Sequence, residues 1–325
     1  MNKSIKLIFN YLLAPLLFIL LSWSLYHQIS SQPDLPERWI QIRQSWKQGS
    51  FWLVFMLMFV NWGIEARKWQ LLISPLEKFT FYKSFKSVLA GCSVTMLTPN
   101  RIGEYGGRII YVQEHNRLKA ISVTILGSMS QLLVTMLVGS CGLLVLKFLP
   151  PQIGPSGSLS WLLGNILMYI SITITVVLIM FYLRIKWIIT AMEKISYLQK
   201  FVRHIKVLDV FSGKQLLRIL FLSFSRYMVF ILQYIILLNV MEVKLSMFLC
   251  FWLLTIFYLV MAVAPTIGFI ELPVRAAASV ELFKIYSPNI LGIQAAALGI
   301  WLINLVLPAI IGSLLIFGIK ILKEK

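Results

Sequence analysis

The sequence predicts an all-α integral membrane protein with six full spans plus two broken or re-entrant helical segments, arranged as an inverted repeat. Its mean hydropathy is +0.83, and 59% of its 325 residues are hydrophobic against 13% charged. A soluble domain of this size could not bury that much apolar surface. Several apolar runs exceed the roughly 18–20 residues that cross a hydrocarbon core, and two further runs are interrupted by Pro, Gly and charge.

The six full spans are apolar runs without the alternation that is typical of outer-membrane strands. They are expected at 7–26, 51–72, 119–147, 161–183, 217–239 and 290–319. The first follows Lys3 and Lys6 but lacks a small-x-small cleavage site, so it is interpreted as a retained span rather than a signal peptide. The two interrupted segments lie near 86–114 and 245–286.

The basic residues predict the orientation. If the amino terminus is cytoplasmic and each interrupted segment enters the membrane and returns, five stretches face the cytoplasm. These stretches hold 20 of the 30 Lys and Arg residues, and they are 1–6, 73–86, 100–119, 184–218 and 320–325. Cytoplasmic loops are enriched in Lys and Arg, so both termini are expected in the cytoplasm.

The net charge of +18 is then explained by this topology and by attraction to anionic lipid. No folded basic domain remains for nucleic acid, so no nucleic-acid partner is expected.

Two cytoplasmic and connecting segments have a distinctive composition. The stretch 184–218 carries eight basic and two acidic residues with interleaved aromatic residues. It is either an interfacial helix held by anionic lipid or a funnel for lipid headgroups. The uncharged linker 148–160 is rich in Pro and Gly, and it divides one transmembrane domain into a first half, 1–150, and a second half, 158–325.

The two broken segments share a pattern: Pro, then Ile-Gly, then Glu, then Arg four residues beyond the Glu. The matched residues are Pro99, Gly103, Glu104 and Arg108 in the first segment and Pro265, Gly268, Glu271 and Arg275 in the second. Pro ends an incoming helix, and Gly lets the backbone turn. Glu is favoured at the N-terminus of the outgoing helix and can pair with an Arg one turn later. The segments are either hairpins closed by structural Glu–Arg pairs or the walls of a polar cavity.

Other polar residues lie within the predicted spans. The second span contains Asn61, Glu65, Arg67 and Lys68 in its second half. An ionisable residue inside a span is a functional hypothesis by default, although Arg67 and Lys68 lie near the cytoplasmic end and can snorkel to the surface. Arg226 lies deeper, and its guanidinium suits bidentate binding of a lipid phosphate. Gln131 and Asn304 lie near the middles of the third and sixth spans.

At these residues the sequence resembles the lysylphosphatidylglycerol synthase transmembrane-region family, the flippase-like membrane domain of the bacterial multiple peptide resistance factor and of stand-alone proteins. The resemblance is carried by residues 66–72, 98–108 and 264–275 and spans roughly 7–320. The second break is less rich in Gly than the family pattern, because Ile267 and Phe269 occupy its turn. The resemblance implies lipid translocation or handling between leaflets, and the expected location is the bacterial cytoplasmic membrane. Larger members carry an aminoacyl-transferase domain after the membrane part. No such domain is expected in this chain, so lysyl transfer is not expected either.

The function expected from these features is flippase-like transport of a phosphate-bearing lipid: a phospholipid, an aminolipid or a polyprenyl-phosphate-linked lipid. Half-helix N-termini and arginines would hold the phosphate. The expected substrate-binding residues are Glu104, Arg108, Glu271, Arg275, Arg226, Arg101 and Arg67.

Two other functions stay open: an intramembrane lipid-modifying transferase, and a non-transporting partner in an envelope-synthesis complex. No enzymatic activity is expected, because Asp is scarce and no paired acidic motif faces the cytoplasm. No Walker-type loop is present, so the chain is not expected to be an ATPase. No cofactor and no metal are expected, since the three Cys and three His residues are scattered. The expected partners are anionic or phosphate-bearing membrane lipids, with homo-oligomers or envelope-synthesis proteins left open.

Overall fold

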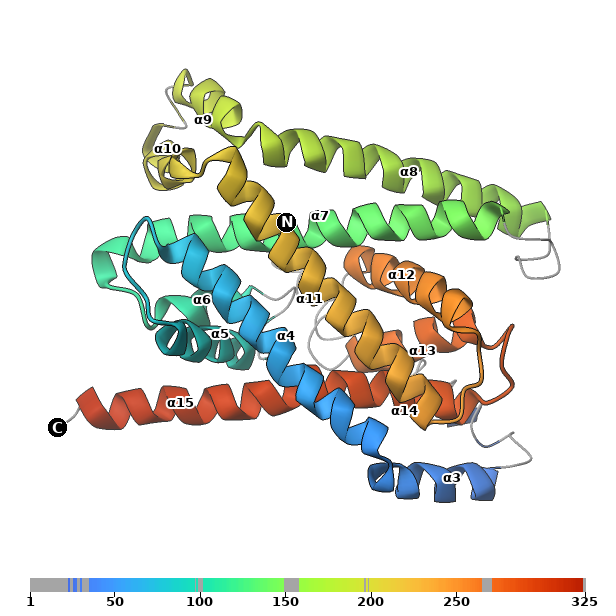
Figure 1. Cartoon of the computed structure of the whole chain (residues 1–325). Helices are drawn as coiled ribbons and strands as arrows, with labels where there is room; N and C mark the ends of the chain where they lie inside the picture. Colours follow the sequence, from blue (N-terminus) through green and yellow to red (C-terminus); the bar gives the residue numbers. More distant parts are fainter. Residues whose placement is uncertain are drawn as a thin grey trace.

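The computed structural model describes residues 23, 26–27, 30, 35–96, 98, 102–148, 158–195, 197, 199–264 and 271–323 (Figure 1). Within those residues every regular element is a helix. Their order is α3 (Leu35–Gln44), η2 (Ser45–Lys47), α4 (Gly49–Ile73), α5 (Phe81–Met96), α6 (Gly103–Ile109), η4 (Glu114–Asn116), α7 (Arg117–Phe148), α8 (Ser158–Leu183), α9 (Ile185–Glu193), α10 (Gln199–Ile205), η6 (Lys206–Val210), α11 (Gly213–Val240), α12 (Met247–Val263), α13 (Glu271–Phe283), α14 (Ile290–Trp301), the π-turn η8 (Leu302–Val306) and α15 (Leu307–Lys323). The prediction of an all-α membrane protein is confirmed.

Five of the described helices are long and apolar enough to cross a membrane. Four of them are α4, α7, α8 and α11, and the fifth runs through α14, η8 and α15. Their ends agree with the predicted spans to within a few residues. The first predicted span, 7–26, lies outside the described residues apart from Trp23 and Tyr26, so the total of six spans stays a prediction.

Both interrupted segments consist of two helices rather than one. The first segment gives α5 and α6, and the second gives α12 and α13. At about 1.5 Å of rise per residue, the seven residues of α6 and the thirteen of α13 are too short to cross a bilayer alone. The helix-breaking residues Pro99, Pro265 and Gly268 lie outside the described residues, and so does Arg101.

Helix α6 returns along α5, so the first broken segment is a helical hairpin. The Ser87 hydroxyl of α5 donates to the Arg108 carbonyl of α6 at 2.9 Å. Near this bond the two backbones touch, because a Cβ added to Gly107 would overlap the carbonyl oxygen of Ala90. Only glycine permits this approach, as in other close helix contacts within membranes. Entry of this hairpin from one membrane face stays a prediction.

The two hairpins lie in opposite halves of the molecule. The α5–α6 hairpin lies at the same end as α9, α10 and the C-terminal end of α15, whereas α12 and α13 lie toward the other end (Figure 1). Helix α5 packs against α15, and α12 packs against α7. One helix of each broken segment therefore packs on the last helix of the other half of the chain. An inverted repeat would produce this exchange, and the repeat itself and its division at 1–150 and 158–325 stay predictions.

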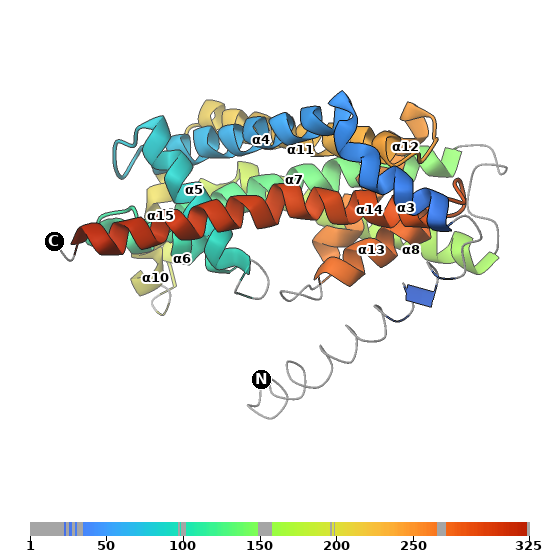
Figure 2. The ribbon, with the colours of Figure 1, turned by 90° about the horizontal axis from the view of Figure 1, so that it is seen from below.

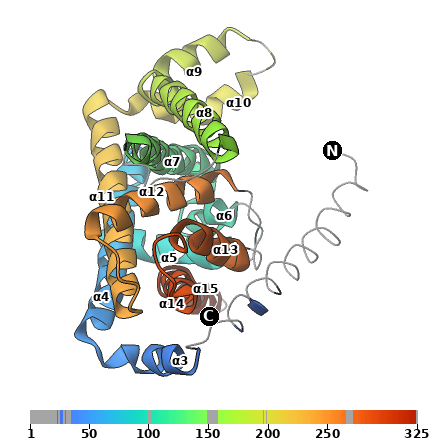
Figure 3. The same ribbon diagram turned by 90° about the vertical axis from the view of Figure 1, so that its right-hand side faces the viewer.

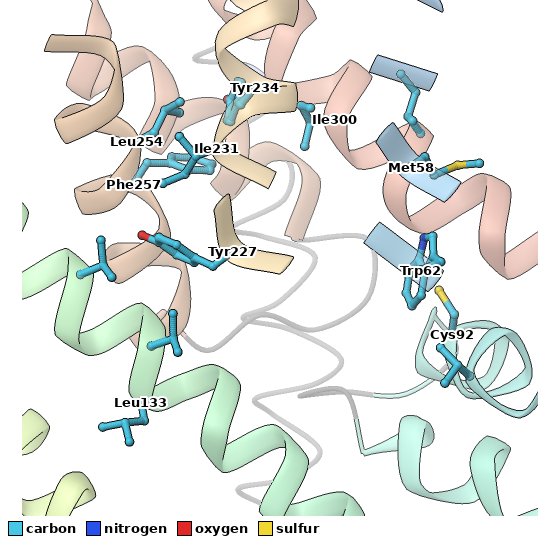
Figure 4. Close-up of a cluster of buried hydrophobic side chains, with 14 of the residues drawn as sticks. Met58, Trp62, Cys92, Leu133, Tyr227, Ile231, Tyr234, Leu254, Phe257 and Ile300 are labelled. Carbon is cyan, nitrogen blue, oxygen red and sulfur yellow. The ribbon is translucent and has the colours of Figure 1, made fainter. Parts of the chain in front are cut away.

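Helices α4 and α11 lie side by side and pack against each other (Figures 1 and 2), and the buried core extends from them to α5, α7, α12 and α14. Figure 4 shows part of it: Tyr227 and Tyr234 of α11 lie beside Phe257 of α12, while Trp62 of α4 lies beside Cys92 of α5. The Tyr234 and Phe257 rings meet edge to face with centroids 5.4 Å apart. The end view shows α8 and α9 on the side of α7 away from α13 (Figure 3).

The short helix α9 in the basic stretch is amphipathic. Ile185 and Ile189 are buried, whereas Trp187 is exposed. This pattern suits a helix that lies along a membrane surface, although both interpretations of the stretch 184–218 stay predictions.

Neighbouring glycines in α6 give a matched test of the hairpin contact. Gly107→Ala is expected to lower the unfolding temperature in detergent, because the new methyl group overlaps the Ala90 backbone and overpacking typically costs about 1–3 kcal/mol. Gly106→Ala is the control, since its added Cβ meets nothing within 4 Å and alanine favours a helix. Equal unfolding temperatures for the two variants would contradict the tight packing of α5 and α6.

Candidate functional site

The centre of the site is a buried ion pair on α4. Glu65 and Lys68 are three residues apart and therefore share a face of the helix. The Lys68 Nζ lies 2.8 Å from the Glu65 Oε2, and each side chain is no more than 3% exposed. Glu65 lies eight residues before the end of α4, about 12 Å along the helix. The pair is thus well inside a membrane-length helix rather than at its tip.

Two arginines from other elements converge on the same carboxylate. The Arg108 Nη2 of α6 lies 2.7 Å from the Glu65 Oε1. The Arg226 Nη1 of α11 lies 3.2 Å from the Glu65 Oε2. Glu65 therefore joins three cations that come from α4, α6 and α11, and we call these four residues together with Glu104 the Glu65 cluster.

Glu104 forms the accessible edge of the cluster. It lies in the first turn of α6 and pairs with the Nη2 of Arg108, as the spacing in the sequence predicts. Its side chain is 27% exposed and that of Arg226 is 13% exposed, whereas the other three members are almost fully buried. With three cations and two carboxylates, the cluster carries one positive charge in excess.

Amide side chains hold Arg226 in place. Its Nε donates to the Asn61 Oδ1 at 2.9 Å, and the Asn61 amide donates to the Asn304 Oδ1 at 3.0 Å. Asn304 lies on the π-turn between α14 and α15. Such turns are frequent at functional sites, and this one brings a fourth element to the cluster.

A serine hydroxyl and a backbone carbonyl also contact the Lys68 ammonium. Its Nζ lies 3.4 Å from the Ser223 Oγ of α11 and 3.5 Å from the Gly127 carbonyl of α7. Ser223 and Ser130 share a hydrogen bond of 2.7 Å. Both hydroxyls can reorient as donors or acceptors, so Ser223 can accept from the ammonium while it bonds to Ser130.

Aromatic rings cover the two guanidinium groups. The Arg108 Cζ lies 5.2 Å from the Trp69 ring centroid, and the Arg226 Cζ lies 5.1 Å from both the Trp62 and Phe230 centroids. The rings stabilise the cations through their quadrupoles and leave the edges of each fork for hydrogen bonding.

The second predicted pair lies on α13. The Arg275 Nη2 donates to the Glu271 Oε1 at 2.8 Å, so this Glu–Arg pair is also confirmed. Arg275 is buried, and its Cζ lies 5.8 Å from the Phe257 ring centroid of α12. The second hairpin thus buries a cation between its two helices.

The structure unites Glu104, Arg108 and Arg226 of the predicted site and adds two residues. Glu65 and Lys68 are central, although only their neighbour Arg67 was among the expected binding residues. Arg67 is exposed and lies outside the cluster. The helical spacing of Asn61, Glu65 and Lys68 could have revealed their common face, because Arg67 follows Glu65 by two residues and points elsewhere.

A comparison with known protein families covers the part of the chain that contains the site. A family model described as the lysylphosphatidylglycerol synthase TM region matches residues 11–312, a range that contains the whole Glu65 cluster. No curated protein and no solved structure matches the chain.

The central role of Glu65 predicts a large loss of stability in Glu65→Gln, since this change leaves buried cations without their shared anion. Breaking a buried pair from one side typically costs about 3–5 kcal/mol. Adding Lys68→Gln returns the cluster to one excess positive charge, so the double variant should recover much of the lost stability. Glu114→Gln is the control, because Glu114 is exposed and pairs with neighbouring Arg117 at 3.3 Å. Thermal unfolding in detergent is measured for the wild type, Glu65→Gln, Lys68→Gln, the double variant and the control. Strictly additive effects of the two cluster substitutions would contradict the shared-anion arrangement.

Proposed function

Because the chain belongs to the lysylphosphatidylglycerol synthase transmembrane-region family, we propose that it moves a phosphate-bearing lipid between the two leaflets of the bacterial cytoplasmic membrane. The lipid is a phospholipid, an aminolipid or a polyprenyl-phosphate-linked lipid. The headgroup passes through the protein while the tails stay in the bilayer. Both termini face the cytoplasm in this proposal, and the chain transports rather than modifies the lipid.

The observation that carries the proposal is the excess positive charge of the Glu65 cluster. Isolated charge is expensive at membrane depth, and charged side chains there mark the paths of substrates and ions. Three cations share two carboxylates, so one further anionic group would balance the site. A phosphate is suited to the place, because its oxygens match the fork of a guanidinium and also accept from an ammonium.

Glu104 is the residue that a phosphate would displace. It is the more exposed of the two carboxylates, and it pairs with Arg108 alone among the cluster cations. Glu65 is buried and contacts all three. A phosphate that replaces Glu104 at Arg108 leaves the buried pairs of Glu65 intact. The exchange therefore avoids the cost of leaving a buried cation unpaired.

Arg275 and Glu271 form a second binding site for the headgroup in this proposal. They repeat the Glu–Arg arrangement on the other hairpin, in the opposite half of the molecule (Figure 1). In this proposal the headgroup passes from the Glu65 cluster to Arg275. Two similar sites of this kind suit alternating access, in which binding must be strong enough for entry and weak enough for release.

The two alternative functions predict different outcomes for the purified protein. Vesicles that contain only this chain should show saturable movement of a fluorescent phospholipid between leaflets if it transports lipid. A lipid-modifying transferase would instead yield a new lipid product in the same vesicles. Neither movement nor product is expected of a partner protein that only stabilises an envelope-synthesis complex.

The exchange at Arg108 predicts that Glu104→Gln loses most lipid movement while its unfolding temperature stays near that of the wild type. The Gln amide keeps the shape of the Glu side chain and can still accept a hydrogen bond from Arg108. It carries no negative charge, so it cannot alternate with phosphate as the anion that pairs with Arg108. Glu281→Gln, a change of an exposed α13 side chain that pairs with Lys284, is the control. Dithionite quenching of the labelled lipid measures the rate, and a wild-type rate in Glu104→Gln would exclude the carboxylate from transport.

Adjacent basic residues on α4 give a second test. Lys68→Gln should weaken the apparent affinity for the lipid about tenfold or more, since a charged hydrogen bond is worth about 1.5–3 kcal/mol. Arg67→Gln should leave transport unchanged, because Arg67 is exposed and outside the cluster. The dependence of the initial rate on lipid content of the vesicles measures both variants. Equal effects of the two substitutions would indicate attraction by bulk charge instead of a built site.

A further inference from the structure

A groove between α7 and α11 lies apart from the Glu65 cluster. Its volume is about 430 Å³, within the range of small-molecule sites. Its lining residues are all apolar, and they are Leu133, Val134, Leu137 and Val138 of α7 and Leu217, Leu220, Phe221 and Phe224 of α11. Leu137, Leu217 and Phe221 are exposed, so the groove opens sideways from two membrane-length helices.

Two basic residues stand at one end of this groove. Lys214 lies in the first turn of α11, and Arg218 follows one turn later. Both are exposed. They share a face with Leu217 and Phe221, because residues three, four and seven apart lie on one side of a helix. This face of α11 therefore carries charged side chains near the start of the helix and apolar side chains farther along it.

The distances along α11 fit a lipid. From Lys214, the groove begins after about 5 Å at Leu217 and ends after about 15 Å at Phe224, at 1.5 Å per residue. The hydrocarbon tails of a bilayer begin at a similar depth below the headgroups, since the core is about 30 Å thick within a bilayer of about 40–45 Å. The surrounding charge is also positive: residues 203–218 include four cations, Arg203, Lys206, Lys214 and Arg218, against the single acid Asp209.

We propose that this groove is a binding site for an anionic phospholipid, whose phosphate pairs with Lys214 and Arg218 and one of whose acyl chains fills the groove. The apolar lining alone gives little preference, because lipid tails are as apolar as leucine. The two cations supply the selectivity for an anionic headgroup, and the groove fixes the position of the tail. Its lining shares no residue with the Glu65 cluster, so it is a different site from the one proposed for transport.

A phosphatidylglycerol with a photoreactive diazirine in its acyl chain tests the site. The full chain is placed in phosphatidylcholine vesicles that contain this probe, irradiated, digested and mapped by mass spectrometry. Labelling is expected to concentrate at 133–138 and 217–224 and to be displaced by unlabelled phosphatidylglycerol but not by phosphatidylcholine.

Substitutions separate the two parts of the site. Lys214→Gln and Arg218→Gln should each reduce the competable labelling roughly fivefold, from the usual contribution of one basic residue near an anionic surface. Lys244→Gln is the matched control, since Lys244 is exposed and lies beyond the opposite end of α11. Leu137→Trp should fill the groove and remove its labelling while the unfolding temperature is retained.

Two results would overturn the proposal. One is labelling at the groove that equals labelling of the exposed α8 residues Ile166, Ile170 and Ile174 and does not change in Lys214→Gln or Arg218→Gln. The other is a cross-link between groove residues and a second copy of the chain in place of lipid labelling. A chain without transport activity that still shows selective labelling supports this site and counts separately against the transport proposal.

Discussion

One buried carboxylate, that of Glu65, is shared by three cations from separate helices. Removing a carboxylate and three cations from water is costly, and only their mutual contacts and hydrogen bonds offset that cost. Lys68 is on the same helix, but Arg108 and Arg226 arrive from α6 and α11. The relative placement of these helices therefore depends on Glu65. In a bilayer the constraint is stricter than in a soluble protein, because no bulk water is present to solvate a cation that loses its partner.

Prediction from sequence succeeded where the determining interactions are local. Hydropathy located the ends of α4 within two residues, since the apolar run itself sets the length of a span. The Glu104–Arg108 pair was predicted because four residues of helix bring both side chains to one face. The contact of Glu65 with Arg226 joins residues far apart in the chain, and no local pattern encodes it. Arg67 was preferred to Lys68 for the same reason: burial depends on which face of α4 meets α11.

The last span shows another limit of local prediction. The run 290–319 appeared to be one helix, yet the structure contains a π-turn at Leu302–Val306. Pro308 lacks the N–H that would bond the carbonyl four residues earlier, so the regular ladder is interrupted beside Asn304. Asn304 lies on this turn, and its side chain accepts a hydrogen bond from Asn61, which in turn accepts one from Arg226. A backbone irregularity thus positions one arginine of the cluster.

Irregular backbone at membrane depth persists only where protein covers it, and α5 covers this π-turn. The Ser93 hydroxyl of α5 donates to the Ala309 carbonyl at 2.6 Å, and the Cys92 thiol approaches the Leu305 carbonyl at 3.6 Å. The same helix holds α6, and with it Arg108, through Ser87. One hairpin therefore supports the position of Arg108 directly and that of Arg226 through the π-turn. A displacement of α5 would therefore move both guanidinium groups together.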